Sequence, residues 1–191
     1  MQVEAVRFLL ENGADAYQRV NSLPPLAHAA SRLERGPELL QVLMDHGTNL
    51  NTVSRPDCRN VLHCAAAVGT VETIEFLVKK GGMDLEKKCK IGCTPLLVAA
   101  RAGNIKNAKA LLNLGAKIHV VSENGGTPLI WSSSWKNVEA VKFWLGTGVD
   151  IDAQDYYGRS KCNSIICTSF IFRFSSPRLD ARSQFKQRLS D

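Results

Sequence analysis

Residues 92–104 read Gly-Cys-Thr-Pro-Leu-Leu-Val-Ala-Ala-Arg-Ala-Gly-Asn, and this stretch decides the fold. Thr94 is a residue type that caps the amino end of a helix, and Pro95 suits the first helical position, where a missing N–H costs no hydrogen bond. Gly103 is expected to end the helix. The stretch therefore predicts one short helix with paired alanines at its centre.

Related segments recur along the chain at one interval. Thr127 and Pro128 repeat the Thr-Pro start, and Leu26, Leu62 and Leu129 stand in register with Leu96. A second anchor is a glycine, which recurs at Gly13, Gly47, Gly81, Gly115 and Gly148. Its intervals are 34, 34, 34 and 33 residues. Two anchors with one period indicate a repeat architecture.

Each repeat is predicted to be a pair of short helices. The second helix of the unit that begins at residue 92 has apolar residues at helical spacing, as at Ile105, Ala108 and Leu111. Gly81 and Gly115 are expected to close such second helices in the left-handed conformation. Since no unit can bury its apolar face alone, three or more must stack.

Composition narrows the class of protein. The 191 residues are 45% hydrophobic and 22% charged, which predicts a structured, soluble chain. No apolar run reaches the roughly 18 residues of a membrane helix, so no membrane segment is expected. The net charge is +6, of which +5 lies from Tyr156 onward, in a basic tail. The main body therefore has little basic excess, and no nucleic-acid partner is expected.

The cysteines predict the compartment. A chain of this size needs no disulfide framework, and the segment after Met1 is too charged for a secretory leader. We expect reduced thiols and a cytosolic or nuclear location. The residues concerned are Cys58, Cys64, Cys89, Cys93, Cys162 and Cys167.

The repeats resemble those of the ankyrin repeat family. Residues 92–104 resemble the first half of its unit, and Leu-Leu-Glu-Asn-Gly-Ala-Asp at residues 9–15 resembles the second half. The resemblance extends from Met1 to about Gly158. It implies an all-α solenoid of stacked helix-turn-helix units with short β-hairpin-like fingers, used in most members to hold another protein.

The resemblance also implies domain boundaries. We expect an array over residues 1–158 and, over 159–191, a degenerate repeat with an irregular basic tail, because Cys162 takes the place of the periodic leucine. This end is interpreted either as a spliced or truncated terminus or as an evolved capping segment. Within the array we expect a partial repeat at 1–20, repeats at about 21–53, 54–87, 88–120 and 121–154, and the start of a fifth at 155.

Partner contacts are implied at the finger tips and at the exposed positions after the alanine pair. Trp, Tyr and Arg most often anchor protein interfaces, which favours Arg101, Trp135, Tyr156 and Tyr157 as the strongest contributors. Thr94, Pro95, Thr127, Pro128, Gly81, Gly115 and His63 are expected to be structural, His63 through a hydrogen bond near a finger. The candidate binding residues are Asp57, Arg59, Lys90, Ile91, Arg101, Glu123, Asn124, Trp135, Tyr156, Tyr157 and Arg159.

Catalytic and metal-binding patterns are not found. The cysteines have no Cys-x-x-Cys spacing, and His63-Cys64 are helix neighbours whose side chains point apart, so no metal site is expected. There is no phosphate-binding glycine loop, Gly-x-Ser-x-Gly elbow or His-Glu-x-x-His motif. We therefore expect no cofactor and no enzymatic activity.

The predicted function is that of a non-catalytic scaffold or adaptor for another protein. The alternatives are a substrate-recruiting subunit of a ubiquitin ligase complex and a fragment of a larger ankyrin-rich protein, including membrane-acting toxins. We expect a monomer without a membrane or nucleic-acid partner. Apolar surface at uncapped ends would favour aggregation.

The stacking hypothesis predicts that Ala99→Leu destabilises the chain. A larger side chain at a paired-alanine position would force the stacked helices apart, at a cost of about 1–3 kcal/mol. Thermal unfolding of the variant beside the wild type measures this, and an unchanged melt would count against stacked units.

Overall fold

The computed structural model describes residues 2–15, 34–53, 57–133, 138–150 and 153–156. In these ranges the chain is helical and has no strand. The predicted first helix of the unit at 21–53 and the tail after Gly158 lie outside the described residues. The helices are α1 (Gln2–Glu11), α3 (Gly36–Asp45), α4 (Val61–Val68), α5 (Val71–Lys79), α6 (Pro95–Ala102), α7 (Ile105–Asn113), α8 (Pro128–Ser133) and α9 (Val138–Gly146).

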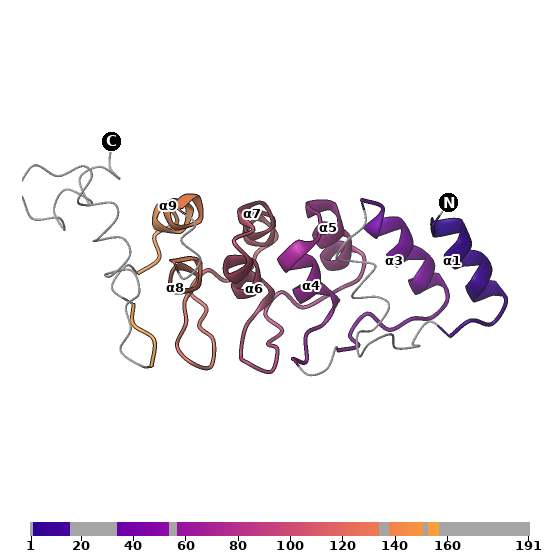
Figure 1. The fold of residues 1–191 in the computed structure, drawn as a ribbon, viewed down its shortest axis with the longest axis horizontal. Helices are drawn as coiled ribbons and strands as arrows, with labels where there is room; N and C mark the ends of the chain where they lie inside the picture. Colours follow the sequence, from indigo (N-terminus) through magenta and orange to yellow (C-terminus); the bar gives the residue numbers. More distant parts are fainter. Residues whose placement is uncertain (1, 16–33, 54–56, 134–137, 151–152, 157–191) are drawn as a thin grey trace, which may run out of the picture.

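The helices form two parallel rows along one axis (Figure 1). One row holds α4, α6 and α8, the first helices of their units, and successive members pack against each other. The other row holds α1, α3, α5, α7 and α9, the second helices of their units. Loops between units extend beyond the first row as fingers, on the side away from the second row (Figure 1). The fold is therefore an all-α solenoid.

Side chains at the start of the helices α4 to α8 bond the free backbone amides. The hydroxyl of Thr94 accepts from the N–H of Leu97 at 3.4 Å, and Pro95 occupies the first turn of α6. Thr127 accepts from the N–H of Ile130 at 3.3 Å, just before Pro128 begins α8. Such caps satisfy amides that have no partner inside the helix.

The core runs continuously from unit to unit. Leu62, Leu96 and Leu129 hold the same place in successive first helices and are at most 1% exposed. Beside them the alanine pairs of α4 and α6 are also buried, and they belong to the same apolar cluster as the leucines. Small side chains at these places let neighbouring helices approach closely. The apolar faces are thus covered by adjoining units.

A buried amide joins the third unit to the second. The Nδ2 of Asn107, in α7, donates to the carbonyls of Ala65, Ala66 and Gly69 at 3.0, 3.3 and 2.8 Å. These carbonyls lie at the carboxyl end of α4, where the last carbonyls of a helix lack intrahelical donors. The carbonyl of Ala65 also accepts from the N–H of Gly69 at 2.8 Å. Asn107 is 2% exposed. One side chain therefore completes the hydrogen bonding of a helix in the preceding unit.

The prediction that Gly81 adopts the left-handed conformation is wrong. The left-handed residue after α5 is Gly82, with φ +60°, and Gly81 does not have positive φ. The exit from α5 contains one residue more than the exit from α7, where Gly115 is left-handed as expected, with φ +100°. Gly81 is instead required by space. A Cβ there would lie 2.6 Å from the carbonyl oxygen of Leu77 and 2.8 Å from Leu50.

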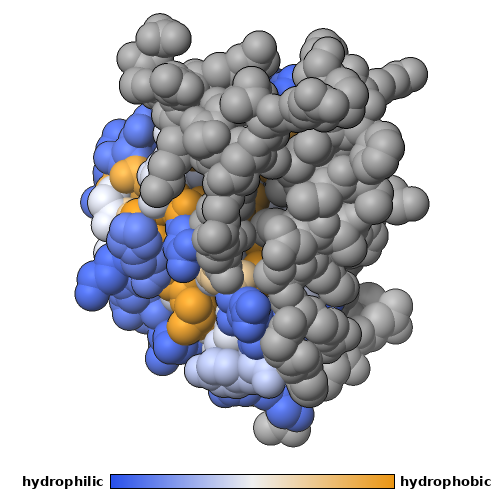
Figure 2. All heavy atoms as spheres, turned by 90° about the vertical axis from the view of Figure 1, so that its left-hand side faces the viewer, coloured by the Kyte–Doolittle hydropathy of each residue, from blue (hydrophilic) through white to orange (hydrophobic). Residues whose placement is uncertain are grey.

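The fourth unit replaces the alanine pair with serines. Ser132 and Ser133 are fully buried, and their hydroxyls donate to carbonyls one turn back, those of Leu129 at 2.9 Å and Ile130 at 2.8 Å. Figure 2 looks at the C-terminal end of the array, where apolar surface is visible between polar side chains. Val138, at the start of α9, is 42% exposed. Apolar atoms therefore reach the surface in this unit.

The bonds of Asn107 predict that Asn107→Leu destabilises the chain by about 1–3 kcal/mol, because buried carbonyls at the end of α4 would lose their donor. Chemical denaturation gives the free energy of unfolding. Asn113→Leu, an exposed asparagine on the same helix, is the matched control and should change it by less than about 0.5 kcal/mol. Equal effects of the two substitutions would contradict the role of Asn107.

Candidate protein-binding surface

The finger tips are tied to one another by backbone hydrogen bonds. One bond joins each pair of neighbouring fingers, so that four tips separated in sequence form one line, here called the finger row. Each finger takes the number of the repeat that it opens, so the tips belong to the second (Asp57), third (Lys90, Ile91), fourth (Glu123, Asn124) and fifth (Tyr156) fingers. The three bonds run from Lys90 N–H to the Asp57 carbonyl (3.0 Å), from Glu123 N–H to the Ile91 carbonyl (3.2 Å) and from Tyr156 N–H to the Asn124 carbonyl (3.0 Å). The structure thus brings together six of the candidate residues.

The fingers at residues 89–93 and 122–126 are closed at the base like hairpins. The N–H of Cys89 donates to the carbonyl of Cys93 at 3.0 Å, and the N–H of Ser122 donates to the carbonyl of Gly126 at 3.1 Å. The backbone of the fingers is therefore held while tip side chains remain accessible. Ile91 is 37% exposed and Tyr156 is 75% exposed.

Arg59 is half-buried beside the second finger. Its Nε lies 3.8 Å from the Asp57 carboxylate, so this candidate pair makes an ion pair within its own finger. The Asp57 side chain is the more exposed of the two. Asp57 lies in the finger row and Arg59 lies beside it, but each charge is partly neutralised by the other.

Arg101 stacks on an aromatic ring that the sequence analysis did not single out. Its guanidinium carbon lies 5.1 Å from the ring centre of Trp131, which comes from α8 of the next unit. Trp131 packs on the small apolar cluster of Cys89, Cys93, Leu97 and Val98. Trp131 stands one residue before the serine pair. An alignment of the units could have drawn attention to this large aromatic residue beside the paired small ones.

The indole of Trp131 lies directly on backbone. A Cβ at Gly126 would come within 2.6 Å of the indole Nε1, so this contact requires a glycine. The Nε1 atom is buried and has no hydrogen-bond partner in the part of the chain that the structure describes. The ring is thus held by packing, and it supports the guanidinium of Arg101.

His63 links α4 to the third finger. Its Nε2 lies 3.0 Å from the carbonyl oxygen of Cys93, and the N–H of Asn60 donates to its Nδ1 at 3.3 Å. Burial lowers the pKa of His63 to about 4, so the ring is neutral near pH 7. The Cys93 carbonyl can only accept, so the bond to it needs a proton on Nε2. The Nδ1 atom, which then accepts from the Asn60 N–H, also lies 2.6 Å from the Oδ1 of Asn60. The base of the third finger is thereby attached to the preceding unit.

The remaining candidates cannot be placed relative to the finger row. Trp135, Tyr157 and Arg159 lie outside the described residues. Val68, which follows the alanine pair of α4, is 61% exposed.

The described residues hold no group of three His, Cys, Asp or Glu side chains arranged to bind a metal. Their four cysteines carry free thiols, and burial raises the pKa of the Cys93 thiol to about 11, which keeps it protonated. In the same ranges, no helix combines the length and apolar character needed to cross a membrane.

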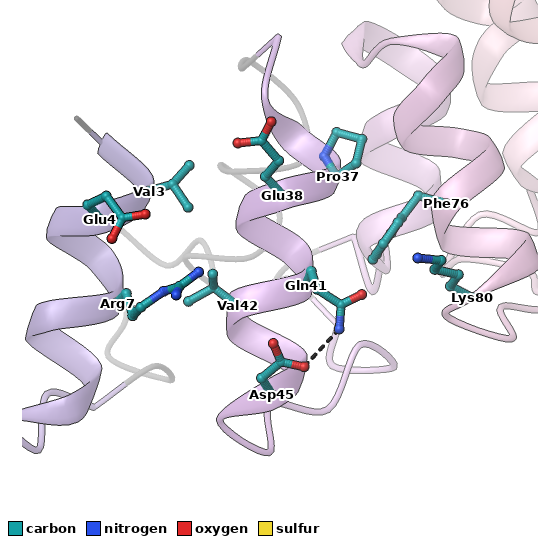
Figure 3. A pocket seen from close by; sticks show the side chains of 10 residues that line it. All are labelled: Val3, Glu4, Arg7, Pro37, Glu38, Gln41, Val42, Asp45, Phe76 and Lys80. Carbon is teal, nitrogen blue, oxygen red and sulfur yellow. Dashed lines mark hydrogen bonds between the residues drawn. The ribbon is translucent and has the colours of Figure 1, made fainter.

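A shallow groove of about 400 Å³ lies on the other row of helices, between α1, α3 and α5 (Figure 3). Its walls carry both signs of charge, from Arg7 and Lys80 and from Glu4, Glu38 and Asp45. Gln41 donates to Asp45 at 2.8 Å, and the Lys80 ammonium lies 5.7 Å from the ring centre of Phe76. Polar groups here already contact neighbours, which makes the groove a weaker candidate than the finger row.

A family pattern described as ankyrin repeats (3 copies) matches residues 26–122 and, in an overlapping match, residues 92–155. Together these matches span more than half of the chain. The chain belongs to the ankyrin repeat family. Ankyrin repeats generally mediate protein–protein interactions, and they are generally not enzymatic.

Several curated proteins are similar to this ankyrin repeat chain. Neurogenic locus notch homolog protein 2 of Homo sapiens is 29% identical over 148 residues, which are 77% of this chain and 6% of that protein. Transient receptor potential cation channel subfamily A member 1 of Homo sapiens is 29% identical over 160 residues, 79% of this chain and 14% of the channel. An L-asparaginase of Dirofilaria immitis is 29% identical over 123 residues, 64% of this chain and 20% of that protein.

The chain spans only 6% to 20% of the length of these relatives. The matches to notch homolog protein 2 and to the channel lie in their ankyrin repeats, so what this chain shares with them is the repeat array.

The burial of His63 predicts a pH dependence of stability. Its pKa is about 4 in the folded chain against 6.5 as the ordinary value, so the unfolded chain takes up the proton first as the pH falls. The contribution of His63 to the free energy of unfolding is fully present above pH 6.5 and is lost as the pH falls toward 4. Between these values the wild type should lose up to about 1.4 kcal/mol per pH unit more than His63→Gln.

Denaturant unfolding at a series of pH values measures this difference. His46→Gln, at an exposed histidine, is the matched control for the same substitution outside the core. Identical slopes for the wild type and His63→Gln would show that the folded ring accepts a proton freely.

Proposed function

We propose that this chain is a non-catalytic scaffold that holds another protein on the finger row and on the adjoining last turns of α4 and α6. Membership of the ankyrin repeat family supports binding of a protein partner in general. The finger row supports this particular face, because its tips are joined by backbone bonds while side chains such as Ile91 and Tyr156 remain exposed.

The observation that carries the proposal is the order already present in the finger row. A surface whose backbone is fixed before binding loses little conformational entropy when a partner arrives. The bonds between fingers use the main-chain groups of the tips and leave their side chains available for recognition. Interfaces of this kind draw most of their affinity from a few aromatic, Arg and apolar side chains.

We also propose a reducing compartment, the cytosol or the nucleus. Cys89 and Cys93 lie together in one apolar cluster, and both carry free thiols. Unlinked neighbouring thiols are typical of reducing compartments.

The test of the proposed face is a pair of substitutions at exposed tips. Ile91→Asp and Tyr156→Ala should each weaken binding of a partner by at least about 1 kcal/mol, because they remove accessible contact area. Neither should lower the melting temperature appreciably, since both side chains are exposed.

Proteins captured from a lysate by the full chain supply the partner, and isothermal titration calorimetry supplies its affinity. Glu72→Ala, an exposed side chain on α5 in the other row, is the control and should bind like the wild type. Wild-type affinity in both tip variants, with a loss in the control, would place the interface on the other row.

A further inference from the structure

Arg101 presents a charge that the described part of the chain does not neutralise. Its side chain is half-buried, and none of the described carboxylates lies within 4.0 Å of its guanidinium. A partly buried cation gains more from a counter-ion than an exposed one, because the surroundings screen the attraction less.

Trp131 fixes the guanidinium in place. The guanidinium carbon lies over the indole ring, 5.1 Å from its centre, and this cation–π contact restrains the rotamers of Arg101. A guanidinium has five N–H donors, and a cation–π contact with the ring uses none of them as a hydrogen bond to an acceptor oxygen. This arrangement suits a carboxylate, which an arginine can bind through two parallel hydrogen bonds.

Basic side chains lie on the finger that leads into the helix of Arg101 and on the finger before it. Lys87, Lys88 and Lys90 are exposed on the third finger, and Arg59 lies on the finger before it. The charges of Arg101 and Arg59 both lower the pKa of the buried Cys93 thiol, against the larger effect of burial, which raises it. The acidic side chains at neighbouring tips are Asp57, already in an ion pair, and Glu123.

Apolar surface adjoins these charges. Val68, on α4 next to the helix that carries Arg101, is 61% exposed, and Ile91 at the tip of the third finger is 37% exposed. A partner segment that is purely acidic would leave both uncovered. A segment that combines carboxylates with apolar side chains would match both features.

We propose that Arg101, stacked on Trp131, binds a carboxylate of an acidic protein segment that also places apolar side chains on Val68 and Ile91. This inference rests on the proposed function and names the chemistry of the partner. Lys87, Lys88 and Lys90 attract the segment at longer range, whereas Arg101 supplies the directional contact.

A nucleic acid fits the same surface less well. Its phosphates need a track of cations, and single-stranded bases need open aromatic faces on which to stack. The ring of Trp131 is half-buried and carries Arg101 on one face. The basic side chains are also interrupted by Val68, Ile91 and Glu123.

The test is selection of phage-displayed random peptides on the full wild-type chain, on Arg101→Glu and on Lys106→Glu. Lys106 is exposed on α7, in the other row of helices, so its substitution changes the net charge equally. Circular dichroism melts verify that all three chains fold. Affinities of the selected peptides follow from fluorescence anisotropy.

We expect Asp and Glu, mixed with apolar residues, to be enriched on the wild type and on Lys106→Glu but not on Arg101→Glu. Selected peptides should bind Arg101→Glu about tenfold or more weakly, and replacing their acidic residues with Lys should restore binding to that variant.

Four results would overturn the inference. Peptides that depend on Ile91 and Tyr156 but lack acidic residues, or that lose equal affinity on both Glu variants, would leave the proposed function standing without this partner chemistry. Absence of any selected peptide would remove both. Tighter binding of a single-stranded RNA oligonucleotide than of the peptides, weakened by Arg101→Glu, would assign the surface to nucleic acid.

Discussion

The structure depends on the burial of apolar side chains between neighbouring helix pairs. Leu62, Leu96 and Leu129 are covered only because first helices lie side by side, and the small alanines beside them set the close spacing. No helix pair contains enough apolar surface to fold alone, so each stabilises the next. Asn107 adds a polar link of the same kind, because it completes the end of α4 from the following unit.

This coupling also positions the candidate binding surface. The position of each finger is set by the helices to which it is joined. Stacking of the helices brings each finger tip within hydrogen-bond distance of its neighbour. His63 extends the same coupling to the base of the third finger, since its neutral ring joins α4 to Cys93. Recognition therefore takes place on side chains whose backbone is fixed by the packing of the core, and the basic charge around Arg101 is presented on a rigid support.

Much of the fold could be predicted from local sequence, because Thr-Pro starts and periodic leucines act within single units. The conformation of Gly81 could not, since the additional residue after α5 moves the left-handed position to Gly82. Most described finger-tip candidates follow from the repeat register. Neither Trp131 nor Asn107 was anticipated, because their contacts join different units and depend on how adjoining helices are rotated. The order of the finger row rests on main-chain bonds, which side-chain patterns do not encode.

Native-state hydrogen exchange tests the coupling between units most directly. If neighbouring units stabilise each other, the slowest amides of α4, α5, α6 and α7 should open with one common free energy and respond together to low concentrations of denaturant. Separate opening free energies for the pair α4–α5 and the pair α6–α7, each with its own denaturant dependence, would show that the helix pairs fold independently and would contradict this account.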